Sequence, residues 1–297
     1  MGEGAIGIDI GGTSVRVGEG RPDGDVALIS KFETPPTFDL LTGELLAVLA
    51  PVLGAGGAHT PVGVGVPGAV RADGSTWVPN VPYLSHPNLP AGLRSALGAA
   101  VVVANDAQMA LLGEAVHGAA RDHRDVVLVT FGTGVGGATM HDGRVVRGVH
   151  GATGAFGWFG CDPHAAGRDH GPLEARASGH ALQRAAAGTH SIAGWGTSAV
   201  QASRNEAVSE EQLLRKAAEA AGHAIGSLVS MLDPGLLVIG GGLGMRFADC
   251  SDVLLDAVKT CASPIGREVP AVWSELADLG GMIGAVEAAT KGRQAWL

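Results

Sequence analysis

The segment from Ala5 to Thr34 reads AIGIDIGGTSVRVGEGRPDGDVALISKFET. Apolar residues recur in three runs within it, at Ile6–Ile10, Val15–Val17 and Val26–Ile29. A Gly-Gly pair separates the first two runs and an Arg-Pro-Asp-Gly sequence separates the last two, and both are typical of tight turns. The segment therefore predicts three antiparallel strands in a meander, with a glycine-rich first hairpin.

The same pattern recurs in the middle of the chain. Val126–Phe131 predicts a strand, Gly132–Gly137 a glycine turn and Ala138–His141 a second strand. Asp142-Gly143 is then a hairpin signal before the apolar pair Val145-Val146. A repeated unit of this kind predicts two α/β domains of like topology with a cleft between them.

The rest of the chain predicts further helices and strands. Strands are expected at Pro61–Val66, Val101–Ala104 and Leu236–Ile239, and helices at Leu40–Leu53, Ala107–Val116, Leu173–Ala187, Glu210–Leu232 and from about Met282. The proline-rich segment Trp77–Pro90 predicts an ordered loop. We expect a first domain at residues 1–104, with a C-terminal helix at about 283–297 packing on it, and a second, larger domain at residues 105–282.

Composition limits the possible functions. The chain has 297 residues, is 46% hydrophobic and carries a formal charge of −9, so it can bury a sizeable core but has no basic run for nucleic acid. Its three cysteines give no disulfide framework. The sequence shows neither a secretory signal nor an apolar run long enough to span a membrane. We therefore expect a cytoplasmic protein that binds neither nucleic acid nor membranes.

Two glycine loops carry the chemistry of anion binding. Glycine lets backbone N–H groups approach a phosphate closely, the hydroxyl of Thr13 can donate to it, and Asp9 can hold water on Mg²⁺. The candidate phosphate-binding residues are Gly11, Gly12, Thr13, Gly132, Thr133, Gly134 and Gly136. Each loop alone could be an ordinary hairpin. Neither is a Walker A or dinucleotide motif, because each leads into a strand and no Gly-Lys-Ser/Thr sequence follows.

A set of motifs, in order along nearly the whole chain, resembles the ROK family of repressors, uncharacterised frames and sugar kinases. These motifs are Asp9-Ile-Gly-Gly-Thr13, Gly65-Val-Pro-Gly68, Val78-Pro-Asn80, Asn105-Asp106-Ala107, Gly132-Thr-Gly-Val-Gly-Gly137, Arg147-Gly148, Gly151-Ala152, Leu173-Glu174-Ala175, Ala177-Ser178-Gly179 and Gly240-Gly-Gly242. The resemblance implies an actin-like (ribonuclease H-like), hexokinase-type fold with mixed sheets, with Mg·ATP and a sugar bound between its two domains, and often a homodimer. Only eight residues precede Asp9, too few for the DNA-binding domain of the repressors.

The resemblance also implies roles for single residues. Asp106 matches the catalytic base, although a helix N-cap at Asn105 or Asp106 is the alternative from the sequence alone. Asn80 and Asn105 match residues that hydrogen-bond sugar hydroxyls, and Gly68 matches a turn that approaches the sugar. Gly241 and Gly242 match the loop beside adenosine, for which a plain turn is the alternative.

The segment Gly151–His164, GATGAFGWFGCDPH, departs from the family pattern. Members that phosphorylate glucose-like sugars read Gly-Ala-x-Gly-Glu-x-Gly-His, and this chain has Ala155 and Trp158 at the Glu and His positions. Ala155 accepts no hydrogen bond and an indole only donates one, so we expect altered sugar recognition. Trp158 could stack on a substrate ring or fill the space of a missing zinc loop.

The structural zinc motif of the family is missing. The histidine position holds Trp158, and the three cysteine positions hold Ala165, Gly167 and Pro172. We therefore expect no bound metal at this place, because none of these side chains ligates zinc. A replacement site is the alternative, with the candidate ligands Cys161, His164, Asp169 and His170.

These observations predict an enzyme that transfers phosphate from ATP, with Mg²⁺, to a hydroxyl of a sugar or sugar-like polyol. Polyphosphate is a less favoured donor, because the sequence has no evident basic groove. The alternative is a catalytically weak or inactive protein that keeps the fold and binds sugar or nucleotide as a regulator.

Overall fold

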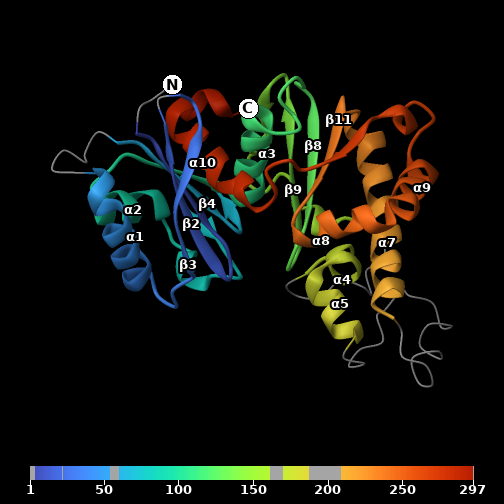
Figure 1. Ribbon diagram of the computed structural model, residues 1–297, viewed down its shortest axis with the longest axis horizontal. Helices are drawn as coiled ribbons and strands as arrows, with labels where there is room; N and C mark the ends of the chain where they lie inside the picture. The colour runs from blue at the N-terminus through green and yellow to red at the C-terminus, as the bar shows by residue number, and fades with distance from the viewer. Residues whose placement is uncertain (1–3, 22, 54–59, 161–169, 187–208, 297) are drawn as a thin grey trace. The chain divides into compact units, whose positions relative to one another are not determined.

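The computed structural model describes residues 4–21, 23–53, 60–160, 170–186 and 209–296. Their contacts divide the chain into two compact units (Figure 1). Unit 1 comprises Met1–Arg124, Ala138–Thr153 and Asp278–Leu297, and unit 2 comprises Asp125–Gly137 and Gly154–Ala277. The domain boundary expected near residue 104 stays a prediction; by contacts, the helix that follows it belongs to unit 1.

Unit 1 is built on a five-stranded mixed sheet of order β3-β2-β1-β4-β7. Its strands are β1 (Ile6–Ile10), β2 (Ser14–Gly20), β3 (Val26–Glu33), β4 (Val62–Val66) and β7 (Val101–Asn105). The antiparallel pairs of β2 with β1 and β3 confirm the predicted meander, and β4 and β7 run parallel to β1. The three parallel strands consequently end at the same edge of the sheet.

Helices cover both faces of this sheet. They are α1 (Phe38–Leu53), α2 (Leu89–Leu97), α3 (Asp106–His117) and α10 (Gly280–Lys291). Unit 1 also contains the short strands β5 (Ala69–Val70), β6 (Thr76–Trp77) and β10 (Arg144–Val145) and the single-turn helices η2 (Pro82–Leu84) and η7 (Gly292–Ala295). The isoleucines of β1 share a core with the leucines of α1 and α2. On the opposite face α10 lies directly on β1 and β4, since a Cβ at Gly63 would overlap the Ala285 carbonyl (Figure 1).

A second five-stranded sheet has the order β10-β9-β8-β11-β12. Its strands, besides β10, are β8 (Val126–Phe131), β9 (Val135–His141), β11 (Leu236–Gly240) and β12 (Ala271–Trp273). The helical elements of unit 2 are η3 (Phe156–Trp158), α4 (Glu174–Ala177), α5 (Gly179–Ala186), α7 (Glu210–Leu232), α8 (Gly242–Arg246), η4 (Phe247–Cys250), α9 (Ser251–Cys261) and η5 (Gly266–Glu268), and η6 (Ala277–Leu279) leads to α10. The two sheets share one strand order, which confirms the predicted repeat.

Two local expectations are wrong. The helix expected at Leu173–Ala187 is interrupted at Ser178, whose backbone is extended and whose hydroxyl accepts a hydrogen bond from Ala181 N at 3.1 Å, at the start of α5. The expected loop Trp77–Pro90 contains η2 and the start of α2, with Pro90 in the first turn. Proline fits there because the first turn has no use for its missing N–H.

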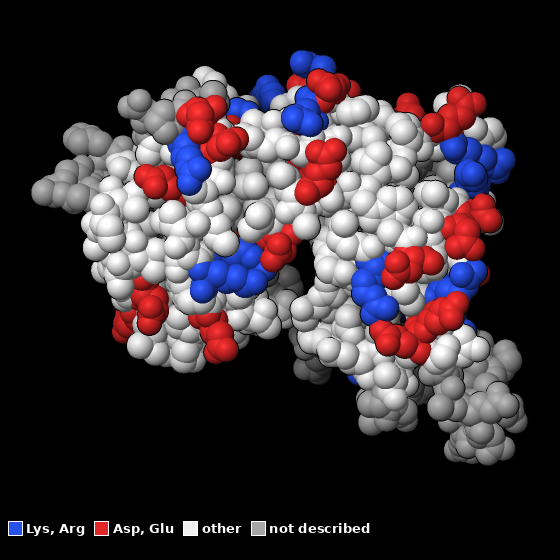
Figure 2. All heavy atoms as spheres, viewed as in Figure 1, with Lys and Arg blue, Asp and Glu red and all other residues white. Residues whose placement is uncertain are grey.

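The described surface is mixed in charge. On the face drawn in Figure 2, acidic and basic side chains lie in small interspersed groups. Within the part of the chain that the structure describes, none of the helices is both long enough and apolar enough to cross a bilayer.

Candidate active site

Asp9 and Asp106 lie at the carboxyl edge of the unit 1 sheet. Asp9 of β1 is paired with Gly65 of β4, and Gly65 is paired with Ala104 of β7, so the next residues of β7 and α3 emerge at the same level. A Cβ added at Gly65 would lie 3.5 Å from Asp9 Oδ1 and 3.5 Å from Asp106 Cα. The glycine therefore lets two acidic residues approach each other across one strand.

Asn105 is the N-cap of α3, and Asp106 is the first helical residue. The Asn105 Oδ1 accepts hydrogen bonds from Ala107 N at 3.0 Å and Gln108 N at 3.2 Å. Its Nδ2 donates to Asp106 Oδ1 at 3.0 Å and to Gly68 O at 3.2 Å. Of the two capping alternatives, the structure thus supports Asn105, and the cap also orients the Asp106 carboxylate.

Burial controls the charge of both acids. It raises the pKa of Asp106 to about 6, against hydrogen bonds from Ala107 and Asn105 that favour the ionised form. The pKa of Asp9 is raised to about 7, mainly by burial and then by the nearby charges of Asp106 and Asp278, while Arg16 acts in the opposite direction. Paired carboxyls with pKa values near neutrality are typical of functional sites.

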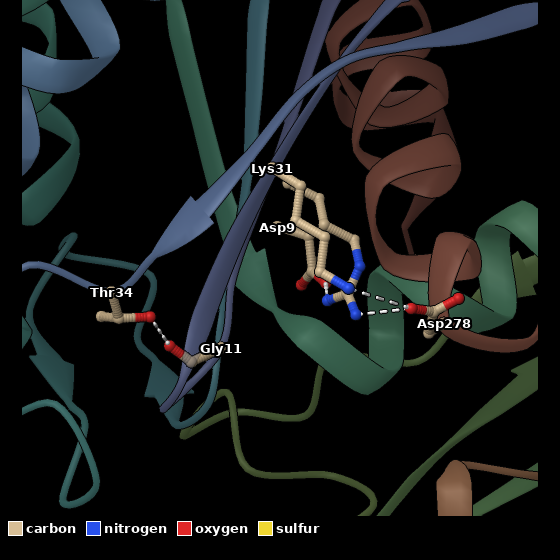
Figure 3. Close-up of polar contacts among 6 residues, drawn as sticks. Asp9, Gly11, Lys31, Thr34 and Asp278 are labelled. Carbon is tan, nitrogen blue, oxygen red and sulfur yellow. Dashed lines mark hydrogen bonds and ion pairs between the residues drawn. The ribbon is translucent and has the colours of Figure 1, made fainter.

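Arg16 lies beside Asp9 on the neighbouring strand β2. Its Nη1 is 3.7 Å from Asp9 Oδ2, and its Nη2 donates to Asp278 Oδ2 at 2.6 Å. Figure 3 shows Asp9, Lys31 and Asp278 converging on this place, with Lys31 Nζ 3.9 Å from Asp278 Oδ2. The Asp9 carboxylate fits against the start of α10 because Gly281 has no side chain there.

The first glycine loop is held by Thr34, which follows β3. Thr34 Oγ1 donates to Gly11 O at 2.7 Å, and Thr34 N donates to Thr13 O at 3.1 Å (Figure 3). Gly12 and Thr13 are exposed at the tip, and a Cβ added at Gly12 would lie 4.0 Å from Asn80 Cβ. The structure therefore places Asn80 next to a fixed loop whose tip is open to a ligand.

The second glycine loop, in unit 2, is held from outside by Glu174. Gly132 N donates to Gly134 O at 2.9 Å, and Val135 N donates to Glu174 Oε2 at 2.9 Å. Gly179 N, at the start of α5, donates to Gly132 O at 2.7 Å. The sequence pattern contains Glu174 within the Leu-Glu-Ala motif, but sequence reasoning gave this carboxylate no role.

Gly241 forms the turn between β11 and α8. Its φ is +81°, and a Cβ there would overlap the Phe131 carbonyl. Glycine is required at such a position because L side chains rarely adopt positive φ in crowded surroundings. The turn alternative thus describes the local structure, and adenosine binding at Gly241 and Gly242 stays a prediction.

Within the segment that departs from the family pattern, Phe156–Trp158 form the short helix η3 in unit 2. Phe156 is buried against β9, where Gly137 leaves room for its ring. Ala155 is exposed, and the Trp158 side chain is 48% exposed. Both alternatives for Trp158, stacking on a substrate ring and filling the space of the zinc loop, stay predictions.

The expectation of no bound metal at this place stays a prediction, because most of the positions concerned lie outside the described residues. Within them, no group of three or more His, Cys, Asp or Glu side chains could hold a metal ion. Of the four candidate replacement ligands only His170 is described, and Cys161, His164 and Asp169 lie outside the described residues, as do the aligned positions Ala165 and Gly167.

The chain matches known proteins over most of its length. The model of the ROK family matches residues 5–291. The glucokinase of Streptomyces coelicolor is 31% identical, covering 86% of this chain and 85% of the relative, and the N-acetylmannosamine kinase of Citrobacter koseri is 32% identical, covering 81% and 83%. The crystal structure of a ROK family glucokinase from Streptomyces griseus with glucose and AMPPNP is 28% identical, with a TM-score of 0.74, covering 97% of this chain and 100% of that one.

Proposed function

Because the chain belongs to the ROK family and the two relatives reported above are sugar kinases, we propose that it is an ATP-dependent kinase acting on a hydroxyl of a sugar or sugar-like polyol. The observation that carries the proposal is the pair of partly buried acids, Asp9 and Asp106, at the carboxyl edge of the unit 1 sheet beside a fixed glycine loop.

In this proposal Asp106 is the general base. It accepts the proton of the substrate hydroxyl as that oxygen forms a bond to the γ-phosphorus of ATP, and the bond from phosphorus to the β,γ-bridging oxygen breaks to release ADP. Its pKa of about 6 leaves it mostly ionised at pH 7 and still able to accept a proton. The Asn105 cap holds the carboxylate in place.

Asp9 is the proposed residue for Mg²⁺, directly or through water. The residues fit this ion, because carboxylate oxygens are its preferred ligands and the Asp9 side chain keeps 14% of its surface exposed. When bound, Mg²⁺ neutralises charge on the transferring phosphate. The backbone N–H groups of Gly12 and Thr13 are proposed to donate to the phosphates, whereas Gly11 N donates to Ser14 O at 2.9 Å within the loop.

The loop of unit 2 is proposed to contact the same nucleotide. Its backbone and the exposed Thr133 hydroxyl offer donors to the phosphates, and the turn at β11 would approach the adenosine. The residues proposed for these contacts are Gly132, Thr133, Gly134, Gly136, Gly241 and Gly242.

Substrate recognition is proposed to combine Gly68, Asn80, Asn105 and Trp158. Ala155 and Trp158 stand at the family's glutamate and histidine positions, so this edge of the site lacks the carboxylate acceptor and the imidazole. We therefore infer weak binding of unmodified glucose. The relatives bear different substrate names, glucokinase and N-acetylmannosamine kinase, and therefore do not fix the sugar. Homodimer formation and a cytoplasmic location remain expectations from the sequence.

The test incubates the protein with Mg·ATP and a panel of hexoses, amino sugars and polyols, and measures the ADP that is released. We expect one class of substrate to react, and Asp106→Asn to lower kcat by about 100-fold or more. Asp25→Asn, an exposed acid before β3, is the matched control and should leave kcat unchanged. Lack of turnover with the whole panel would contradict the kinase proposal, and sugar-induced thermal stabilisation without turnover would favour the regulatory alternative.

A further inference from the structure

A row of charged side chains crosses three strands of unit 1. Asp9 on β1 is directly opposite Arg16 on β2, and Arg16 is directly opposite Lys31 on β3. Directly opposite residues of an antiparallel pair share one face of the sheet. One acid and two bases therefore lie side by side, and Asp278 faces them from the segment before α10 (Figure 3).

Arg16 contacts the two acids of this cluster unequally. Its contact with Asp278 is a close hydrogen-bonded ion pair at 2.6 Å, whereas its nearest approach to Asp9 is 3.7 Å. The Arg16 side chain is only 14% exposed, and among the described residues its buried Nε has no hydrogen-bond partner. The guanidinium therefore has a donor to spare and a second carboxylate within reach.

Asp278 is held by the chain on either side of it. It belongs to η6, whose first residue, Ala277, has a φ of +49° and donates its N–H to Ser274 Oγ at 2.9 Å. Two residues after Asp278 the chain enters α10, which is packed on β1 and β4. The backbone that carries Asp278 is thus fixed on both sides, although the side chain that pairs with Arg16 is 63% exposed.

We propose that Asp278 is a positioning residue that holds the Arg16 guanidinium away from Asp9 and so keeps the Asp9 carboxylate open to Mg²⁺. This inference rests on the role of Asp9 in the proposed function. Without Asp278, Arg16 pairs closely with Asp9 and competes with the cation for the same oxygens. Lys31 contributes little, because it is half exposed and 3.9 Å from Asp278.

The test measures Mn²⁺ binding, as a paramagnetic substitute for Mg²⁺, to the full chain with saturating AMPPNP. The readout is the electron paramagnetic resonance signal of free Mn²⁺, which needs no turnover. We expect Asp278→Asn to weaken Mn²⁺ binding about tenfold, as expected when a charged hydrogen bond forms at the metal ligand. Arg16→Met should bind Mn²⁺ at least as tightly as the wild type.

The decisive variant is the double substitution Arg16→Met with Asp278→Asn. It should recover the Mn²⁺ affinity of Arg16→Met, because the competing cation is gone. Asp25→Asn and Lys31→Met, which remove single charges elsewhere in unit 1 or at the edge of the row, should match the wild type. Thermal unfolding of each variant checks that the fold is retained.

Two results would overturn the inference alone. These are unchanged Mn²⁺ affinity in Asp278→Asn, and a double variant that binds as weakly as Asp278→Asn. If the wild type binds AMPPNP but no Mn²⁺ beyond what the free nucleotide holds, the magnesium role of Asp9 fails, and the inference fails with it. Turnover by a wild type of that kind would leave the kinase proposal standing.

Discussion

The ionisation of Asp106 opposes folding at neutral pH. Its pKa is about 6 in the folded chain against 3.8 for an ordinary aspartate, so the native state binds more protons than the unfolded state between these values. The stability therefore falls as pH rises through this window. Asp9, with a pKa raised to about 7, acts in the same direction over a wider range.

Asp106→Asn should accordingly stabilise the protein while it abolishes turnover. We expect the free energy of unfolding at pH 8 to rise by about 2 kcal/mol, because a neutral amide avoids the buried charge and keeps an acceptor for Ala107 N. Near pH 4 the gain should largely disappear. Urea unfolding at both pH values measures this, and equal or lower stability of the variant at pH 8 would contradict it.

The same pKa predicts the acid limb of the rate profile. If Asp106 is the base, kcat/KM should decline below about pH 6, because the carboxyl then carries the proton that it must accept. The measurement is kcat/KM from pH 5 to 8 at constant ionic strength. A flat profile over this range would argue against Asp106 as the base.

At the scale of single residues, the sequence identifies those residues of the candidate site that belong to motifs. Asp9, Asn105 and Asp106 lie at or directly after strand ends, and the structure brings them together at one edge. Arg16 and Asp278 are 262 positions apart, so their pairing depends on how α10 returns to the first sheet. Nothing in the residue types of Arg16 and Asp278 indicates from the sequence that the two side chains form an ion pair.

At the scale of elements, glycines allow α10 to pack closely on its neighbours. A Cβ at Gly284 would overlap the Met109 carbonyl of α3, so Gly284→Ala should destabilise the chain by at least about 2 kcal/mol. Gly43→Ala in α1 is the matched control, since nothing lies within 4 Å of its added Cβ, and it should be neutral or slightly stabilising. Urea unfolding decides, and equal effects of the two substitutions would contradict this packing argument.

The hydrogen bond between Thr34, which follows β3, and the first glycine loop leads to a second prediction at this scale. Thr34→Val removes the hydroxyl that bonds Gly11 O but keeps the side-chain shape. We expect the KM for ATP to rise about fivefold with little change in kcat, since a hydrogen bond is worth about 1 kcal/mol. Thr34→Ser keeps the hydroxyl and should resemble the wild type. An unchanged KM in Thr34→Val would show that the bond does not position the loop.

Strands were easier to predict from this sequence than helices. Alternating apolar residues identified the meander, and short apolar runs identified the strands β4 and β11, in which every residue is buried. The break at Ser178 and the start of α2 depend on local capping that hydrophobic spacing does not report. The helix α9 and the short strand β12 were not predicted, since their positions depend on packing against α7 and β11.

At the scale of the whole molecule, the repeated strand order was visible in the sequence, and the domain boundary near residue 104 stays a prediction. A glycine hairpin opens each of two equivalent sheets. In both sheets the strands that come first along the chain pair antiparallel, and the later strands are added in parallel. The extent of each unit depends on contacts between distant segments, and unit 1 combines three separate stretches of chain.

The placement of α10 has a consequence for synthesis. Its residues leave the ribosome after those of all the strands, yet they complete the face of the sheet that carries Asp9. Unit 2 can gather its described segments as soon as residue 277 is made, whereas unit 1 stays without its closing helix until nearly the whole chain has emerged. The strands β1 and β2 therefore gain their contacts with α10 late, whereas α3, which packs on β4 and β7, directly follows β7 in the chain.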